Sequence, residues 1–490
     1  MRRFFAVFVV ITVPVFCFAQ DFGFGFEDES PGSASILPVS LKIAGEIKAG
    51  QTFFFDDFKK GEMYERFQDL DFFSARINFS VTGKSADTFI GINLSYRNFA
   101  DLADLRPGHT PRMLDEAWVR GYFGPVNLQA GFMKLTWGRM HSYGPLDVVN
   151  PFDYTDLSKL PEPKKIKIAR PMIHAAWSMG SFTKLEAVFV PWLQGYKYAT
   201  SGRWTPVQIN SLVSQLPALA GGLEYAMSAM SIPEPYFSAF KNDLDNWRTN
   251  FTVEDHYRDY DLSMRYAQAG MRFTTTVASS DLGFQYYFGR PSRPRVRIGI
   301  NEYLSGLSTL SPDPAKIVDI DYNYFHQIGA DFARVVAGFN LRAEAGVNLT
   351  NDLDGKDGAV ENPAIIWGLG FDRDLFAGIN LNLQGTGKVR LFHSRISDNP
   401  LYDCEAGSKT SFSRITGIVA RKFFREELEL KVRCLWGIED RDFLIMPAFV
   451  WSRNDVMLEL SAGFFGGDKK GELGQYRDNS FFRAIVVYKF

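Results

Sequence analysis

A run of basic side chains closes one distinctive stretch of the chain, residues 131–170. Between positions 159 and 170 a single carboxylate, that of Glu162, opposes five cations: Lys159, Lys164, Lys165, Lys167 and Arg170. Upstream in the same stretch lie Arg139, Asp147, Asp153 and Asp156. Cations that line a pore lower the energy barrier for anions, and the aspartates could form the opposing side of a constriction. Such charges are also typical of a solvated surface loop, or of a rim that binds anionic lipid headgroups.

Other residues of types that could catalyse a reaction or bind a metal form no recognisable catalytic or metal site. The six histidines lack metal-ligand spacing: His109, His141, His174, His256, His326 and His393. Residues 352–357 resemble a calcium loop, but Asp357 stands where an EF-hand needs glycine. The glycine-rich stretch 463–471 lacks the spacing of a phosphate-binding loop. We therefore expect no enzyme, no cofactor and no catalytic or metal-binding residue.

The last ten residues, 481–490, alternate with the two-residue period of a β-strand. Phe482, Val486, Tyr488 and Phe490 share one face, and ten residues is the length of a tilted transmembrane strand. In a soluble protein this strand would be a sticky edge, unless it lay buried in a sandwich. In a closed barrel it has no free edge and lipid covers its apolar face. The segment resembles the C-terminal assembly signal of bacterial outer-membrane barrels, which implies the barrel assembly machinery as a partner.

The amino end has the features of a secretory signal peptide. A basic start, Met1-Arg2-Arg3, precedes an apolar run to Phe18, and Ala19 ends a favourable cleavage site. We expect cleavage after residue 19. Cys17 raises the alternative of a lipoprotein, although bulky Phe16 before it fits a lipobox poorly. Residues 20–38 are rich in glycine, serine and acids, and predict a flexible periplasmic lead-in.

Residues 39–490 predict an all-β fold, a transmembrane antiparallel β-barrel of about 16–18 strands. Alternating segments such as 39–55 and 72–82 are joined by connections that are alternately long and short, as in barrels with long outer loops and short periplasmic turns. Aromatic residues make up 15% of the chain, which suits the aromatic girdles of such barrels. A net charge of −2 gives no reason to expect nucleic acid as a partner. Cys404 and Cys434 could pair, but the sequence does not show that they meet.

One connection, residues 193–266, is too long to lack structure of its own. Residues 208–230 have helical apolar spacing, and residues 236–247 could form a second helix. We expect a helical loop insert here. It could be a flap on the barrel rim or a plug inside the lumen.

The stretch 131–170 also carries a motif: Gly131, Trp137, Gly138, Asp147, Val148, Asn150, Pro151 and Asp153. With this motif the chain resembles a porin-like family of Gram-negative outer-membrane β-barrels related to alginate-export barrels. Phe132-Met133 departs from the Arg-Gln usual there, which weakens any transfer of substrate. The stretch is the third long connection by our count, and the resemblance implies that it folds inward and narrows the channel.

We therefore expect a bacterial outer-membrane porin-like channel for passive diffusion of small hydrophilic solutes, surrounded by outer-membrane lipid. An anion preference would rest on Arg139, Lys164, Lys165, Lys167 and Arg170, opposed by Asp147 and Asp153, with the loop 136–170 narrowing the pore. The alternatives are an importer specific for an apolar ligand and a plugged surface barrel, an adhesin or structural protein. Assembly as a homotrimer, the solute and the open or plugged state stay undecided at this point.

Overall fold

The computed structural model describes residues 40–60, 73–95, 113–230, 232–253, 260–298, 305–306, 317–399 and 403–490. The expected signal peptide, 1–19, and the lead-in, 20–38, lie outside the described residues.

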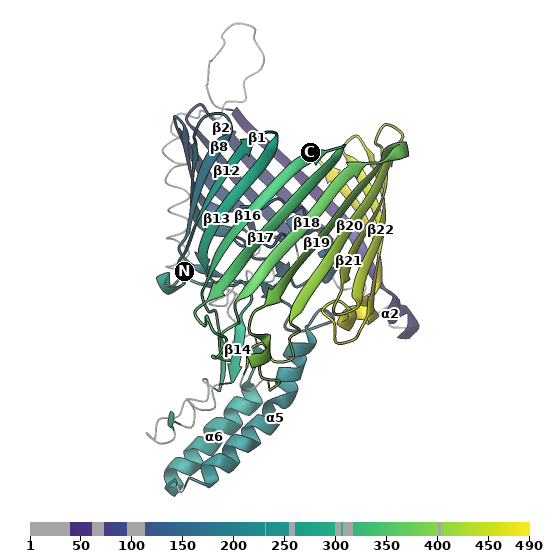
Figure 1. Ribbon diagram of the computed structural model, residues 1–490. Coiled ribbons are helices and arrows are strands. Elements are labelled where there is room, and N and C mark those ends of the chain that lie inside the picture. The colour runs from purple at the N-terminus through teal and green to yellow at the C-terminus, as the bar shows by residue number, and fades with distance from the viewer. Residues whose placement is uncertain are drawn as a thin grey trace, which may run out of the picture.

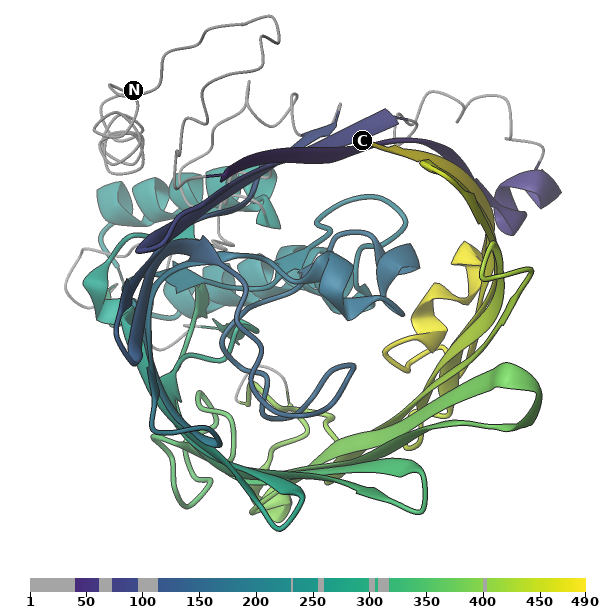
Figure 2. The same ribbon diagram turned by 90° about the horizontal axis from the view of Figure 1, so that it is seen from above.

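Eighteen antiparallel strands form one closed barrel (Figures 1 and 2). Each barrel strand pairs with the barrel strands before and after it along the chain, and β1 (Ser40–Phe54) pairs with β24 (Phe481–Lys489) to close the ring. The other barrel strands are β2 (Phe73–Thr82), β3 (Ala86–Ser95), β4 (Leu114–Phe123), β5 (Val126–Met133), β7 (Arg170–Ser178), β8 (Thr183–Val190), β12 (Gln268–Val277), β13 (Ser280–Gly289), β16 (Phe325–Val336), β17 (Phe339–Thr350), β18 (Ala364–Asp374), β19 (Ile379–Arg390), β20 (Ser411–Phe423), β21 (Leu428–Gly437), β22 (Asp442–Arg453) and β23 (Val456–Gly467). The expected antiparallel barrel is confirmed, at the upper end of the expected strand number.

Connections of two to four residues join the strands at one end of the barrel, and the connections at the other end are long except for residues 438–441 between β21 and β22. The turns expected near 179–181 and 279–281 correspond to residues 179–182 and 278–279. Figure 1 shows the short turns at the top, beside the carboxyl terminus, and the long connections below. In outer-membrane barrels the end with short turns faces the periplasm, so the long connections are the outer loops.

The last strand shows how the alternating pattern divides between the two faces of the wall. Phe482, Val486 and Tyr488 are exposed on the outside, whereas Phe481 and Val487 are buried on the lumen side. In the outer membrane, lipid covers the outward face. The alternation in the sequence therefore reflects the two environments of the barrel wall, lipid on the outside and the lumen on the inside.

Closure of the barrel depends on a glycine opposite the carboxyl terminus. Gly45 and Phe490 exchange two backbone hydrogen bonds, and a Cβ atom on Gly45 would lie 2.5 Å from Cζ of the Phe490 ring and 2.7 Å from the Arg76 carbonyl oxygen. We expect Gly45→Leu to destabilise the closed barrel by about 1–3 kcal/mol or more, because the side chain forces the first strand away from its neighbours. The gel shift of unheated against heated protein measures this. Gly417→Leu is the control, since its Cβ would meet only Leu383 at 3.6 Å; equal loss in both variants would contradict the prediction.

Short helices and strand pairs lie in the connections. The α-helices are α2 (Phe55–Lys60), α4 (Pro163–Ile166), α5 (Val207–Ser228) and α6 (Glu234–Asn250), and the 3-10 helices are η2 (Leu157–Lys159), η3 (Met264–Tyr266), η5 (Phe376–Gly378), η6 (His393–Arg395) and η7 (Gly474–Asn479). Short paired strands are β6 (Asp153–Tyr154) with β10 (Lys197–Tyr198), β9 (Leu193–Gln194) with β11 (Tyr260–Asp261), and β14 (Arg295–Ile298) with β15 (Val318–Asp321). No helix among the described residues is both long and apolar enough to span a membrane. Cys404 and Cys434 are unbonded.

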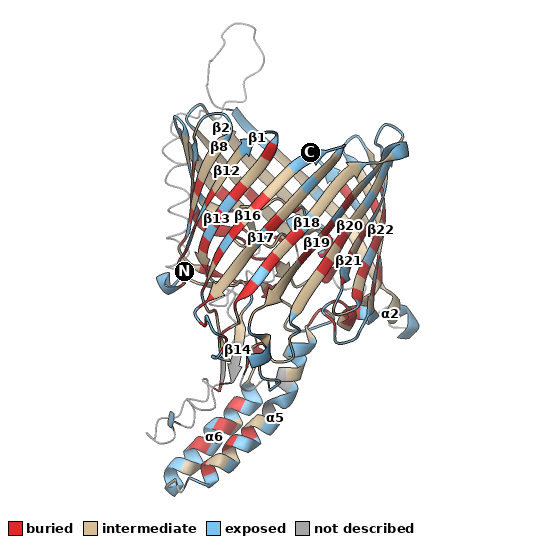
Figure 3. Cartoon of the chain, in the orientation of Figure 1, coloured by how far each residue is buried: buried red, intermediate tan, exposed pale blue. Residues whose placement is uncertain are grey.

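The helical spacing within residues 193–266 corresponds to α5 and α6, which form an antiparallel hairpin with a core of its own. Leu223 and Met227 of α5 are buried together with Phe240, Leu244 and Trp247 of α6. Figure 3 shows buried positions recurring along both helices. The hairpin extends from the outer-loop end of the barrel, away from the strands (Figure 1).

Candidate functional site

The connection between β5 and β7, residues 134–169, enters the barrel and crosses its interior; we call it the third loop. Figure 2 shows it inside the ring of strands. It is held at three places: where it leaves the wall, at its tip, and at its helical segment. These attachments define the candidate site.

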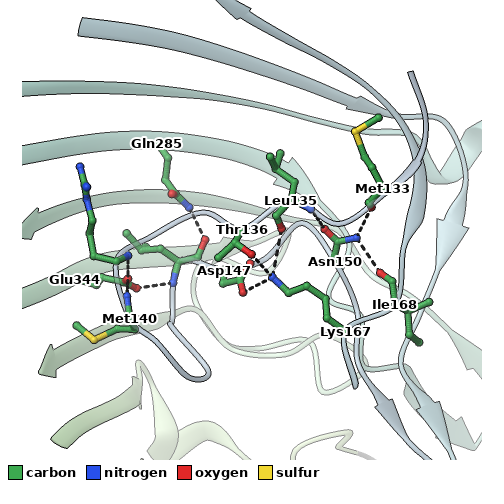
Figure 4. Close-up of polar contacts among 12 residues, drawn as sticks. Met133, Leu135, Thr136, Met140, Asp147, Asn150, Lys167, Ile168, Gln285 and Glu344 are labelled. Atoms are coloured by element: carbon green, nitrogen blue, oxygen red, sulfur yellow. Dashed lines mark hydrogen bonds and ion pairs between the residues drawn. The ribbon is translucent and has the colours of Figure 1, made fainter. Parts of the chain in front are cut away.

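Asn150 ties the two ends of the third loop together (Figure 4). Its Oδ1 accepts a hydrogen bond from the backbone of Leu135 at 2.8 Å, and its Nδ2 donates to the carbonyls of Met133 at 3.0 Å and Ile168 at 2.8 Å. The side chain is 2% exposed. An asparagine amide can donate and accept at once, which apolar residues of similar size cannot do. This explains asparagine at the centre of the Asp-Val-x-Asn-Pro sequence.

A buried ion pair lies beside this amide. Lys167 Nζ is 2.6 Å from Asp147 Oδ2 and donates to the Thr136 hydroxyl at 2.9 Å and the Leu135 carbonyl at 3.3 Å (Figure 4). Burial raises the pKa of the Asp147 carboxyl, whereas the Lys167 ammonium acts in the opposite direction. Lys167 is a structural cation of the loop and has almost no surface to offer a solute.

The tip of the loop is fixed by a carboxylate from the far wall. Glu344 of β17 accepts hydrogen bonds from the backbone of Arg139, of Met140 at 2.8 Å and of Leu146 at 3.2 Å (Figure 4). Gly138 has a φ of +86°, and a Cβ there would lie 2.4 Å from Glu344 Oε1. Both the backbone conformation and the close approach require glycine. The Trp-Gly sequence thus places the tip against Glu344.

Neighbouring wall residues bind the same tip through amides. Gln384 of β19 accepts from the backbone of His141 at 2.9 Å, and Gln285 of β13 donates to the Leu146 carbonyl at 2.8 Å. Gln327 of β16 donates to the Pro145 carbonyl at 3.2 Å. The tip is therefore bonded to four strands of one wall, β13, β16, β17 and β19.

Arg139 projects from this tip into a cluster of charges. Its Nε donates to Asp331 at 2.8 Å, and its guanidinium lies 3.4 Å from Asp281. Arg272 shares Asp331, at 2.7 Å. Asp331 is completely buried, and both guanidiniums neutralise it. Arg139 remains about a quarter exposed, so it keeps surface toward the lumen.

The helical segment of the third loop packs against the opposite wall. Leu157, Leu160 and Ile166 share an apolar core with Leu435 of β21 and Leu444 of β22. A hydrogen bond also joins the helical segment to this wall: Arg483 of β24 donates to the Ser158 hydroxyl at 3.0 Å. The third loop therefore spans the interior from the β13–β19 wall to the β21–β24 wall.

The remaining expected site residues have distinct surroundings. Asp153 accepts from the backbone and hydroxyl of Thr155, at 2.9 and 2.5 Å, and so shapes a turn. Arg170 is completely buried and donates to the Val149 carbonyl at 2.7 Å, which leaves it no surface for a solute. Lys164 and Lys165, both on α4, are exposed, and Lys165 lies 2.6 Å from Glu162. Of the expected site residues, the structure brings Asp147 and Lys167 together as an ion pair.

A group of tyrosines, two from the third loop and two from the β8–β12 connection, was not anticipated from the sequence. Tyr154 lies 5.2 Å from Tyr196 and 5.7 Å from Tyr198 between ring centroids, and Tyr143 donates to the Leu160 carbonyl at 2.5 Å. Burial raises the pKa of Tyr196 to about 12, so this hydroxyl stays neutral at physiological pH. The group presents aromatic faces without negative charge. Its members come from two connections, and no local pattern links them.

Comparison with known proteins gives likeness of shape only. No family model matches the sequence, and no curated protein matches it. Among solved structures, Pseudomonas aeruginosa OccK10 (OpdN) is 9% identical with a TM-score of 0.45, over 92% of this chain and 99% of that chain. Escherichia coli Wzi, described as a carbohydrate-binding β-barrel involved in capsule assembly, is 11% identical with a TM-score of 0.42, over 91% and 84%. The outer-membrane channel DcaP of Acinetobacter baumannii is 9% identical with a TM-score of 0.39, over 94% and 99%.

These likenesses are too distant to assign a function, and the fold class rests on the strand pairing of the chain itself. An eighteen-stranded barrel with an apolar outward face is an outer-membrane architecture. The motif resemblance to alginate-export barrels stays a prediction.

Proposed function

We propose that the protein is a porin-like channel of the outer membrane, through which small hydrophilic solutes diffuse passively. Barrels of sixteen to eighteen strands leave an aqueous lumen. The inward face of the wall is polar, since Gln285, Gln327, Glu344 and Gln384 all point into the barrel, where they bind the backbone of the third loop. No cofactor or energy source enters this mechanism, because the solute moves down its own gradient.

The observation that carries the proposal is the third loop, fixed to both walls of the barrel. A segment that crosses a lumen reduces its free cross-section and brings its own charges close to a passing solute. We propose that the loop 136–170 sets the size limit of the channel. A planar-bilayer recording of the refolded mature protein tests this: stable conductance steps support a channel, and a correctly folded barrel without conductance would overturn it.

We propose an anion preference carried by the exposed Lys164 and Lys165 of the loop and by the partly exposed Arg139. Lys167 and Arg170 support this arrangement only indirectly, since they hold the loop in shape. Asp147 neutralises Lys167, and Asp153 shapes its turn. The reversal potential in a salt gradient measures the preference.

Reversing the charge of Lys164 and Lys165 is expected to change ion selectivity. A unit charge about 4 Å from an ion in water changes its energy by about 1 kcal/mol, so the anion-to-cation permeability ratio of Lys164→Glu/Lys165→Glu should fall by about fivefold or more. The matched control is Lys59→Glu/Lys60→Glu, which makes the same charge change on α2, outside the ring of strands in Figure 2. Equal reversal potentials for wild type and the α4 variant would remove these lysines from the filter.

The helical hairpin favours a second candidate function, a barrel that acts through its outer surface. The hairpin extends beyond the outer-loop end and has its own core, so it could present a surface to other molecules. An apolar-ligand importer is the third candidate. Deleting residues 207–250 separates the channel from the other two candidates. A channel keeps its conductance without the hairpin, whereas a function carried by the hairpin is lost.

The carboxyl-terminal strand has a proposed role in assembly of the barrel into the membrane. Phe482, Val486 and Tyr488 of β24, together with Phe490 directly after it, are proposed as the signal for the barrel assembly machinery. Particle mass in detergent distinguishes a monomer from a homotrimer.

A further inference from the structure

Four arginines mark the outward face of the barrel beside the short turns. β16, β18, β20 and β22 all run toward that end, and each carries an outward arginine close to its last residue: Arg334, Arg373, Arg421 and Arg453. Adjacent strands lie about 4.8 Å apart, so arginines on alternate strands are separated laterally by about 10 Å. The hairpins β2–β3, β4–β5, β7–β8 and β12–β13 carry no arginine in the corresponding position. We call these four residues the arginine belt, which covers one side of the barrel.

Outward aromatic rings hold two of these guanidiniums in place. Arg373 lies 4.2 Å from the centroid of the Phe339 ring, and Arg421 lies 4.6 Å from that of Phe423. A guanidinium stacked on a ring keeps its N–H edge available for a bidentate bond to phosphate. Among the described residues, no carboxylate forms an ion pair with a member of the belt. The belt is therefore an array of positive charge that no described carboxylate pairs with.

Two carboxylates that are close in sequence to the belt have other partners. Asp374 accepts from the Asn380 amide at 2.9 Å, and Glu426 pairs with Lys422 at 2.7 Å. On the strands themselves, the outward positions that follow Arg373 and Arg421 toward the middle of the membrane are apolar: Phe371, Leu369, Val419 and Gly417. A hydrocarbon surface thus continues directly from the cations toward the middle of the membrane.

An apolar groove of about 450 Å³ lies in this surface. Its outward lining comes from β16 to β19, where large residues flank two small ones: Phe332, Leu341, Leu369, Phe371 and Leu383 beside Ala343 and Gly385. A Cβ on Gly385 would meet only the Trp367 ring, at 3.5 Å, so the depression exists because the side chain is missing. The register places Leu341 opposite both Arg334 and Phe371. The groove therefore begins at the arginine belt.

We propose that this surface binds one phospholipid with a net negative headgroup, from the leaflet on the short-turn side. An acyl chain lies in the groove, and the headgroup phosphate accepts hydrogen bonds from Arg373 and from Arg334 or Arg421. Basic clusters at the membrane surface attract anionic lipids, and each cation near the surface strengthens that attraction. The stacked guanidiniums favour a phosphate held in one orientation. The groove adds apolar contact with the acyl chain, which a zwitterionic lipid would make equally well. The site is independent of solute passage through the lumen.

Native mass spectrometry of the detergent-purified full barrel tests the proposal, with phosphatidylglycerol titrated against phosphatidylcholine of the same acyl chains. The wild type should retain one phosphatidylglycerol at least tenfold more strongly than phosphatidylcholine. Arg334→Gln/Arg373→Gln/Arg421→Gln should lose this preference, and the corresponding lysine variant should keep only part of it. Equal retention by wild type and the glutamine variant would overturn the proposal.

A second variant separates a built site from general attraction of anionic lipid to a cationic rim. Ala343→Leu with Gly385→Leu fills the groove and leaves every charge in place. It should release the retained phosphatidylglycerol if an acyl chain occupies the groove. If retention depends on the arginines but not on the groove, the attraction is diffuse and the proposed site is wrong. This variant also decides the question if the glutamine variant does not fold.

Discussion

Glu344→Leu is expected to release the tip of the third loop and to increase the single-channel conductance by roughly twofold or more, because the segment that narrows the lumen is no longer held across it. Glu344 is the acceptor for three backbone N–H groups of the tip. Leaving buried donors without an acceptor costs about 1–3 kcal/mol each, which is enough to undock a loop from a wall. The barrel strands keep their own pairing, so the variant should still fold.

Two readouts separate loop release from general damage. Single-channel recording gives the conductance and its fluctuations, and limited trypsin digestion reports whether the Arg139 peptide bond has become accessible. Glu344→Gln keeps one acceptor oxygen and should lie between wild type and Glu344→Leu. Glu429→Gln changes another lumen-side carboxylate, which pairs with Lys431 at 3.1 Å and, among the described residues, forms no hydrogen bond or ion pair with the third loop. Unchanged conductance together with a trypsin-resistant loop in Glu344→Leu would refute this role.

Lys167→Met is expected to destabilise the folded third loop by about 3–5 kcal/mol. The substitution leaves the buried Asp147 carboxylate without its cation and removes a donor to the Thr136 hydroxyl. Protease susceptibility of residues 134–169 measures the loop, and urea unfolding of the whole barrel measures the rest. The loop should become cleavable while the barrel midpoint changes much less.

The double variant Lys167→Met/Asp147→Leu tests whether the pair acts as a unit. Removing both charges replaces a buried ion pair with apolar contacts, which is often neutral or stabilising. We therefore expect the double variant to regain most of the resistance that Lys167→Met loses. Additive losses in the double variant would show that each residue acts through other contacts.

The barrel could be predicted from the sequence because its signals are local. Each strand alternates between lipid and lumen every second residue, as in 73–82 and 481–489, and this period does not depend on distant partners. The order of short and long connections follows from the same reading. The hairpin α5–α6 was also accessible, since its apolar spacing lies within one segment.

The third loop could be located from the sequence, but the roles of its charges could not be assigned. The local sequence gives no means of telling apart the basic residues Lys164, Lys165, Lys167 and Arg170, which lie close together with a fifth, Lys159. In the structure two of them are exposed and two are buried, because Asp147 and the Val149 carbonyl occupy fixed positions inside the loop.

The sequence by itself therefore determined the membrane barrel, its strand rhythm, the helical insert and the unusual third connection. Only the tertiary structure decided which side chains hold that connection in the lumen. Glu344 lies 205 residues after Arg139, and Gln384 lies 243 residues after His141. Such contacts depend on the strand register around a closed ring, which no short-range pattern encodes. The arginine belt is the same case, since it becomes one surface only when alternate strands of four hairpins are placed side by side.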